Sequence, residues 1–276
     1  MSELNDTQKQ LIRKAYIDEK RGQAYCAKIA NTSVYTVKKF LKEEKIPIRN
    51  FSEAATLSNR NRKKYSINEK YFDVQTSDMV YLLGFLAADG TIGKKDNIIK
   101  IGLSQVDYDF LKTINQKLGS TYPVKKYTNG QGYECCSLSF TSEYMKKQLA
   151  TFNIVPQKTF SFEIPKNIKS EYFNDFLRGY FDGDGCISTA GSNAIRWSIC
   201  SANKKNMEII VNYLFDNYNI PKVSIQARNP KSENGHILYY IQYSTSAAKK
   251  LFDILYYENC FCLPRKFEKY QKIISD

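Results

Sequence analysis

The first 50 residues place apolar side chains at the spacing of short amphipathic helices. We expect a helix over residues 7–20, a second over 24–30 and a third from residue 34 to about 45, after a polar turn at 31–33. A helix, a tight turn and a basic helix are typical of a helix-turn-helix unit, against the plainer alternative of a three-helix bundle with solvated lysines. The side chains expected to contact DNA are Ser33, Tyr35, Thr36, Lys38 and Lys39.

Residues 51–75 show no clear hydrophobic period, so we predict a basic linker between this helical unit and the rest of the chain. Its cations can lie along the phosphates of a nucleic acid. The residues that we expect to do so are Arg60, Arg62, Lys63 and Lys64.

The remainder of the chain contains the same pattern twice. Residues 81–90 are echoed by residues 176–185, with Asp89 matched by Asp184. Further along, Pro156-x-Lys158 is matched by Pro264-x-Lys266. We interpret this as an internal duplication, with one half over residues 76–165 and the other over 166–276.

Each half then alternates apolar and polar residues with period two, which predicts strands of a half-buried sheet. Ile99 and Ile101 flank Lys100, and Ile195 and Trp197 flank Arg196, so the cations lie on the exposed face. Basic and aromatic residues also flank the predicted hairpin turns. The residues expected to contact DNA are Lys94, Lys95, Lys100, Lys125, Lys126, Tyr127, Arg196, Arg228 and Lys231.

The helix that opens each half carries small residues four positions apart, which allows two helices to approach backbone to backbone. These pairs are Gly84 with Ala88 and Gly179 with Gly183. The glycine after each motif aspartate, Gly90 or Gly185, stands where a helix end favours a left-handed residue.

Such packing brings Asp89 and Asp184 together at two helix C-termini, where the helix dipoles and their mutual repulsion disfavour both charges. A divalent cation with oxygen ligands between them, Mg²⁺ first, relieves this cost. Two carboxylates and a metal beneath a basic sheet form an arrangement suited to phosphodiester cleavage. The plainer alternative is that each Asp-Gly pair only ends a helix.

Composition supports a polyanionic partner. Lysine and arginine number 41 against 28 acidic residues, a net charge of +13, which favours nucleic acid over a membrane surface. The single histidine excludes mechanisms that need a histidine pair, and the seven scattered cysteines favour reduced thiols over a disulfide framework or a zinc site. We expect an intracellular protein, since the sequence shows neither a secretory signal nor a membrane span.

The doubled motif, residues 82–90 and 177–185, with the downstream Pro-x-Lys, resembles single-chain LAGLIDADG homing endonucleases over about residues 76–276. The resemblance implies an α+β fold of two pseudo-twofold-related αββαββα halves, here preceded by a small all-α helix-turn-helix unit. It also implies a saddle of two sheets over double-stranded DNA, cut in both strands by a monomer with Mg²⁺, or Mn²⁺ as a substitute. The implied metal ligands are Asp89 and Asp184 with the carbonyls of Ala88 and Gly183, and the implied catalytic helpers are Lys158, Lys266 and Gln105.

Two positions depart from the family pattern. The often acidic sixth motif position is Ala87 in the first copy and Asp182 in the second, and the counterpart of Gln105 falls near Ser201 or Ala202. The favoured function is a site-specific DNA endonuclease with a long asymmetric target. The alternative is a nucleic-acid-binding protein on the same fold that does not cleave, such as an intron maturase or a transcription regulator.

Overall fold

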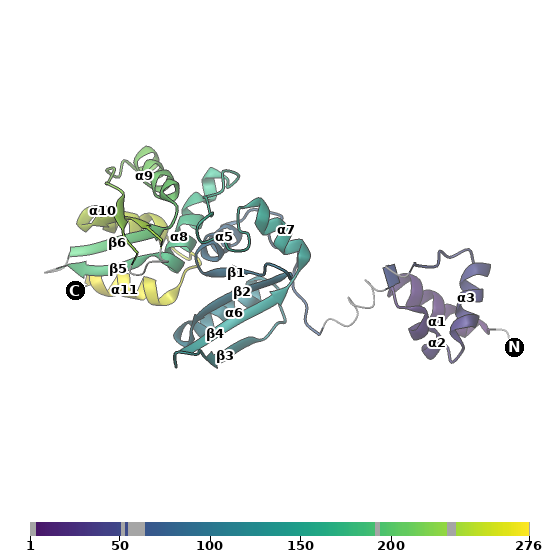
Figure 1. Cartoon of the computed structure of the whole chain (residues 1–276). Helices are drawn as coiled ribbons and strands as arrows, with labels where there is room; N and C mark the ends of the chain where they lie inside the picture. Colours follow the sequence, from purple (N-terminus) through teal and green to yellow (C-terminus); the bar gives the residue numbers. More distant parts are fainter. Residues whose placement is uncertain (1–3, 51–52, 55–63, 191–193, 231–235, 276) are drawn as a thin grey trace. The chain divides into compact units, whose positions relative to one another are not determined.

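The computed structural model describes residues 4–50, 53–54, 64–190, 194–230 and 236–275. The chain forms two compact units, residues 1–66 and 67–276 (Figure 1). Each unit has its own hydrophobic core.

The N-terminal unit is built from three short helical segments. They are α1 (Asp6–Arg13), which continues as a π-helical turn, α2 (Gln23–Ile29) and α3 (Val34–Glu43). Asn5 and Gln8 form a reciprocal capping box at the start of α1, and the Ser33 hydroxyl accepts from the Thr36 N–H at the start of α3. The expected helices are therefore present, while a DNA-reading role for α3 stays a prediction.

The first half of the larger unit contains one antiparallel sheet in the order β1-β2-β4-β3. Its elements are α5 (Ser77–Asp89), β1 (Gly90–Ile92), β2 (Ile98–Ser104), a 3₁₀ turn η2 (Gln105–Asp107), α6 (Tyr108–Lys117), β3 (Val124–Thr128), β4 (Glu134–Thr141) and α7 (Glu143–Thr151).

The second half repeats this order, with strands arranged β5-β6-β8-β7. Its elements are a 3₁₀ turn η3 (Ser170–Tyr172), α8 (Phe173–Asp184), β5 (Cys186–Ala190), β6 (Ala194–Ser201), α9 (Lys204–Tyr218), β7 (Gln226–Arg228), β8 (Leu238–Ser244), α10 (Thr245–Leu255) and a further helix, α11 (Pro264–Ser275). The predicted α+β fold with two αββαββα halves is confirmed.

Each sheet has one buried and one open face, as the period-two pattern predicts. Ile99 and Ile101 in β2, and Trp197 and Ile199 in β6, are almost completely buried in the core. Lys100, between the first two, points to the other face, which we call the open face of the sheet. Figure 1 shows α5 and α8 in the middle of this unit, between the two sheets.

The predicted linker is shorter than expected at its C-terminal end. Residues 67–75 pack on the first half, because Phe72 is buried and the Asn68 N–H donates to the Leu118 carbonyl. A side chain as large as phenylalanine gains about 2 kcal/mol or more from such burial, which fixes this segment to the core.

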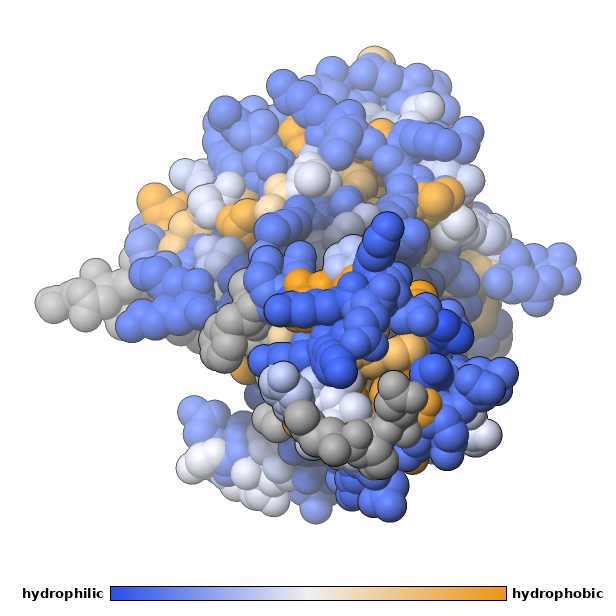
Figure 2. Space-filling view, turned by 90° about the vertical axis from the view of Figure 1, so that its right-hand side faces the viewer, coloured by the Kyte–Doolittle hydropathy of each residue, from blue (hydrophilic) through white to orange (hydrophobic). Residues whose placement is uncertain are grey.

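The surface is largely polar on the face drawn in Figure 2, where hydrophobic residues form only small, separate areas. In the described part of the chain, no helix has both the length and the apolar character needed to cross a membrane.

Candidate active site

The two motif helices, α5 and α8, pack against each other without intervening side chains. A Cβ atom on Gly84 would lie 2.0 Å from the Phe176 carbonyl oxygen, and one on Gly179 would lie 1.9 Å from the Tyr81 carbonyl oxygen. Tyr81 and Phe176 are equivalent residues of the two repeats, so the contact is reciprocal. The predicted close approach about a pseudo-twofold axis is thus confirmed.

The glycines after the motif aspartates differ from expectation. Gly90 has φ −75° and ψ 141°, and Gly185 has φ −84° and ψ 160°, so both are extended rather than left-handed. Glycine is needed there for space: a Cβ on Gly90 would lie 2.5 Å from the Leu86 carbonyl oxygen, and one on Gly185 would lie 2.0 Å from the Phe181 ring. The chain therefore turns directly from each helix into a strand.

This sharp turn brings the two motif aspartates to one seam. The Asp89 Oδ2 atom lies against the backbone of Gly183, where a Cβ would be 3.4 Å away. Burial raises the pKa of Asp89 above its ordinary value. Asp184 is partly open to solvent, yet loss of water around the helix end, and then the nearby Asp89 charge, raise its pKa to about 6.

A buried lysine stands at each end of this seam. Lys158 Nζ donates to the carbonyls of Gly90 at 2.6 Å and Ala88 at 3.5 Å, and Lys266 Nζ donates to the carbonyls of Phe181 and Gly185, both at 2.6 Å. Both lysines are 7% exposed. They place positive charge at two helix C-termini, where it is favourable, and close to both carboxylates.

Burial shifts the pKa values of the two lysines downward, whereas it shifts those of the two aspartates upward. Burial lowers the pKa of Lys158, and it lowers the pKa of Lys266 to about 8, while Asp89 and Asp184 oppose this shift in both cases. Four titratable groups with shifted pKa values thus share one seam, which is common at catalytic sites.

Gln105 stands at the end of β2, as predicted, and its side-chain amide donates to Glu134 at 3.3 Å. The strand register identifies its counterpart. Ile92 pairs with Ile99, and the equivalent Ile187 pairs with Trp197, so six residues further along Gln105 corresponds to Asn203.

The expected counterparts, Ser201 and Ala202, were therefore one or two residues too early. The Asn203 amide donates to the Phe162 carbonyl, and its oxygen caps α9. The ends of β2 and β6 therefore carry different side chains.

The donor set at the seam fits a hard divalent cation. Asp89 and Asp184 supply carboxylate oxygens, and the turns beside them carry backbone carbonyls, which are the ligands that Mg²⁺ and Mn²⁺ prefer. Among the described residues, no three His, Cys, Asp or Glu side chains are grouped closely enough to hold a metal. A cation here would depend on the two aspartates and on neutral oxygen ligands.

A known protein family matches part of the second half of the chain. Residues 171–254 match the LAGLIDADG-like domain family. The second half of this chain carries a LAGLIDADG-like domain. Curated protein sequences show no match to the chain.

Several solved structures resemble this chain at low sequence identity. The homing endonuclease I-WcaI bound to its DNA recognition sequence has 17% identity and a TM-score of 0.45, over 81% of this chain and 95% of that one. A variant of I-SmaMI has 15% identity and a TM-score of 0.47, over 73% and 90%. The N-terminal LAGLIDADG domain of DUF199/WhiA has 18% identity and a TM-score of 0.43, over 70% and 91%.

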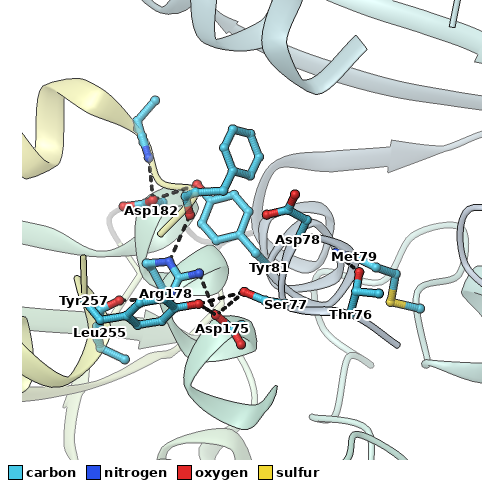
Figure 3. A network of polar contacts seen from close by, with 12 residues as sticks. Thr76, Ser77, Asp78, Met79, Tyr81, Asp175, Arg178, Asp182, Leu255 and Tyr257 are labelled. Atoms are coloured by element: carbon cyan, nitrogen blue, oxygen red, sulfur yellow. Dashed lines mark hydrogen bonds and ion pairs between the residues drawn. The ribbon is translucent and has the colours of Figure 1, made fainter. Parts of the chain in front are cut away.

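The LAGLIDADG-like domain also contains buried polar residues outside the predicted site. Arg178 is completely buried and donates to Asp175 at 2.7 Å and to the carbonyls of Leu255 and Phe261 (Figure 3). The equivalent of Arg178 in the first half is Leu83, so this network exists in one half only.

Asp182, the acidic sixth motif position, belongs to the same region. It accepts hydrogen bonds from the Tyr81 and Tyr256 hydroxyls and from the Leu263 N–H, and it is 1% exposed (Figure 3). Its carboxylate ties α8 to α5 and to the segment before α11. Asp182 is thus a structural residue, and the alanine at position 87 costs the first half no metal ligand.

The open faces of the two sheets carry most of the predicted DNA contacts. Lys125 and Gly102 both pair with Ser137, which puts Lys125 on the same face as Lys100, and Tyr127 lies over Gly102 with the Lys100 ammonium 5.4 Å from its ring. On the second sheet this face carries Arg196 and Arg228, and the tip between β1 and β2 carries exposed Lys94 and Lys95.

Lys126 is an exception among these predicted contacts. It alternates with Lys125 along β3, and its ammonium lies 4.4 Å from the ring centre of Tyr108 in α6. It therefore belongs to the helix-covered face, unlike Lys100, Lys125 and Tyr127.

The open face of the second sheet gives access to the seam. A hollow on it is lined by Asp184 together with side chains of β5, β6, β7 and β8, namely Cys186, Ser198, Cys200, Arg228, Leu238 and Tyr240. A molecule lying on this face can therefore reach the Asp184 carboxylate.

The predicted DNA contacts in the N-terminal unit differ in exposure and in whether they already bond to other side chains. Tyr35 is 64% exposed and Lys38 is exposed, whereas Lys39 pairs with Glu43 at 3.7 Å and the Ser33 and Thr36 hydroxyls bond to each other. Lys64 is exposed. The predicted contacts Arg60, Arg62, Lys63 and Lys231 lie outside the described residues.

Proposed function

We propose that this protein is a site-specific DNA endonuclease that hydrolyses one phosphodiester bond in each strand of a long, asymmetric target, with a divalent metal ion. The observation that carries the proposal is the seam itself. Asp89 and Asp184, the equivalent residues of two repeats, lie close together beside Lys158 and Lys266, and the open face of the second sheet gives access to Asp184.

The reaction adds the oxygen of water to phosphorus while the bridging phosphorus–oxygen bond breaks on the opposite side. The water loses a proton, and the departing oxygen gains one. A divalent ion at Asp89 and Asp184 supplies charge stabilisation and activation of water. The chain's own residues hold this geometry: the ionised aspartates provide anchoring charge, and the lysines hold the turns that present them.

Each lysine retains capacity for a further contact. An ammonium has three donors, and Lys158 and Lys266 each use two acceptors on the helix-end carbonyls. The remaining donor, and the full positive charge, can stabilise the extra negative charge that develops on the phosphate.

The open faces supply binding and selectivity. Lys100, Lys125 and Tyr127 on the first face, and Arg196 and Arg228 on the second, can contact phosphates and base edges in the major groove. Equivalent positions differ, as with Lys100 and Ser198, so the two halves of the target should differ in sequence. The exposed Tyr35 and Lys38 of α3 would extend contact along flanking DNA. Because both halves lie on one chain, a monomer can provide the whole site.

The test is selection of cleaved sites from a randomised duplex library, in Mg²⁺ and in a chelator. The wild-type chain is compared with Asp89→Asn and Asp184→Asn, and with Asp216→Asn, an exposed aspartate of α9, as the matched control. We expect the wild type and the control to cut one class of site in Mg²⁺, while both motif variants bind that site and lose cutting. Binding without cutting by the wild type would instead assign a regulatory or maturase-like role.

A further inference from the structure

An ion pair joins the two halves close to the seam. Arg265 Nε lies 2.9 Å from both carboxylate oxygens of Asp107. Asp107 is 4% exposed, whereas 51% of the Arg265 side chain is exposed. The carboxylate is thus buried on the first half and the cation reaches it from the first turn of α11 in the second half.

Both partners adjoin residues of the proposed site. Asp107 ends the 3₁₀ turn that begins with Gln105, and Arg265 directly precedes Lys266. Asp107 belongs to the first half, the half whose motif aspartate is Asp89. The guanidinium that it holds therefore lies on the first half's side of the seam.

The pair has no equivalent in the other half. Pro156-x-Lys158 aligns with Pro264-x-Lys266, so Arg265 corresponds to Gln157. The register that aligns Ile99 with Trp197 makes Lys205 the equivalent of Asp107, and Lys205 forms an ion pair with Glu163 at 3.7 Å. Among the described residues, the arginine–carboxylate pair at Asp107 thus has no counterpart at the equivalent position, Lys205.

The anchoring leaves the outer part of the guanidinium available. Arginine has five N–H donors in a rigid plane, and Asp107 engages only the Nε donor. Half of the side chain is exposed, and its two Nη groups form a fork of the kind that binds a phosphate through two parallel hydrogen bonds. Holding Nε fixes the direction in which that fork points.

We propose that Arg265, with Asp107 as its positioning residue, binds the scissile phosphate on the Asp89 side only, so that the two DNA strands are cut at unequal rates. This inference rests on the proposed endonuclease function. No covalent step is added: the arginine neutralises charge on the phosphate of one strand during hydrolysis, and the other strand is cut with lysine alone.

The experiment follows each strand of a selected target duplex with its own end label and measures the two nicking rates in Mg²⁺. Arg265→Gln should slow the faster strand on the order of tenfold or more, as loss of a transition-state donor does, and leave the slower strand within about twofold. Asp107→Asn should lower the nicking rate of the same strand by a smaller factor, because the arginine remains but is no longer held in place. Arg265→Lys keeps the positive charge but lacks the planar guanidinium. It should therefore bind the duplex better than Arg265→Gln does, yet lack the difference in nicking rate between the two strands.

Lys272→Gln on the same helix is the matched control, since it removes one exposed positive charge away from the pair. It should change neither strand selectively. Equal slowing of both strands by Arg265→Gln, or equal strand rates in the wild type, would overturn the inference while leaving the endonuclease proposal intact. A wild type that cuts neither strand of any site would instead overturn the endonuclease proposal.

Discussion

Gly84 and Gly179 occupy reciprocal positions, each facing the backbone of the other's helix with no room for a methyl group. Since the obstructing atoms are backbone carbonyls, they cannot move aside as a side chain could. Gly179→Ala should therefore destabilise the larger unit by about 2 kcal/mol or more, at the upper range of overpacking costs. Denaturant unfolding would measure this.

The control for that variant is Gly130→Ala, in the turn between β3 and β4, where a Cβ would meet nothing within 4 Å. It should leave the free energy of unfolding nearly unchanged. Equal stability of both variants would show that α5 and α8 are farther apart than the packing indicates.

The raised pKa of Asp184 makes stability depend on pH when metal is absent. In the unfolded chain this carboxyl loses its proton near pH 4, but in the folded chain it holds the proton until about pH 6. The folded state therefore binds more protons between these values, so stability should fall as pH rises from about 4 to about 6 and then level off. Asp184→Asn should lack this part of the decline in metal-free unfolding measurements.

Divalent ions should offset the loss of stability that accompanies ionisation of Asp184. Binding to the folded state alone raises the free energy of unfolding, by about 2.7 kcal/mol when the free ion is at 100 times its dissociation constant. We expect Mg²⁺ and Mn²⁺ to raise the melting temperature of the wild type at pH 7, and to do so much less in Asp89→Asn. The same rise in both proteins would argue against a cation at the seam.

Lys125 and Lys126 are neighbours in β3 that lie on opposite faces of the sheet. Lys125→Ala should weaken DNA binding and reduce the dependence of log affinity on log salt by about one, as expected for one lost phosphate contact. Lys126→Ala removes the same charge from the helix-covered face and should leave that slope unchanged. Titrations at several salt concentrations test both, and equal slopes for the two variants would contradict the assignment of faces.

The sequence predicts much of this architecture because the duplication repeats every strong local signal. Gly84 and Gly179 indicate the helix contact, and the alternation around Lys100 and Arg196 indicates the two half-buried sheets. Lys126 could not be placed, since a single residue of register decides the face on which a side chain lies. The backbone of Gly90 was mispredicted because its constraint comes from a steric contact with Leu86 rather than from a helix cap.

Local sequence patterns do not predict contacts that join distant segments of the chain. Arg265 and Asp107 are 158 positions apart, and Arg265 is the variable middle residue of Pro264-x-Lys266. Their pairing follows only from the way in which α11 crosses to the first half. Arg178 likewise bonds to distant carbonyls, that of Leu255 at the end of α10 and that of Phe261 in the segment after it.

The polar network around Asp182 limits how far the two halves can be exchanged. Its Tyr81 partner comes from α5, and the residue equivalent to Tyr81 in α8 is Phe176, which has no hydroxyl. An engineered protein made of two copies of the second half would give each buried carboxylate one hydrogen bond fewer. A stable protein with two identical halves built from this scaffold would therefore require Phe176→Tyr in both copies, or removal of the acid.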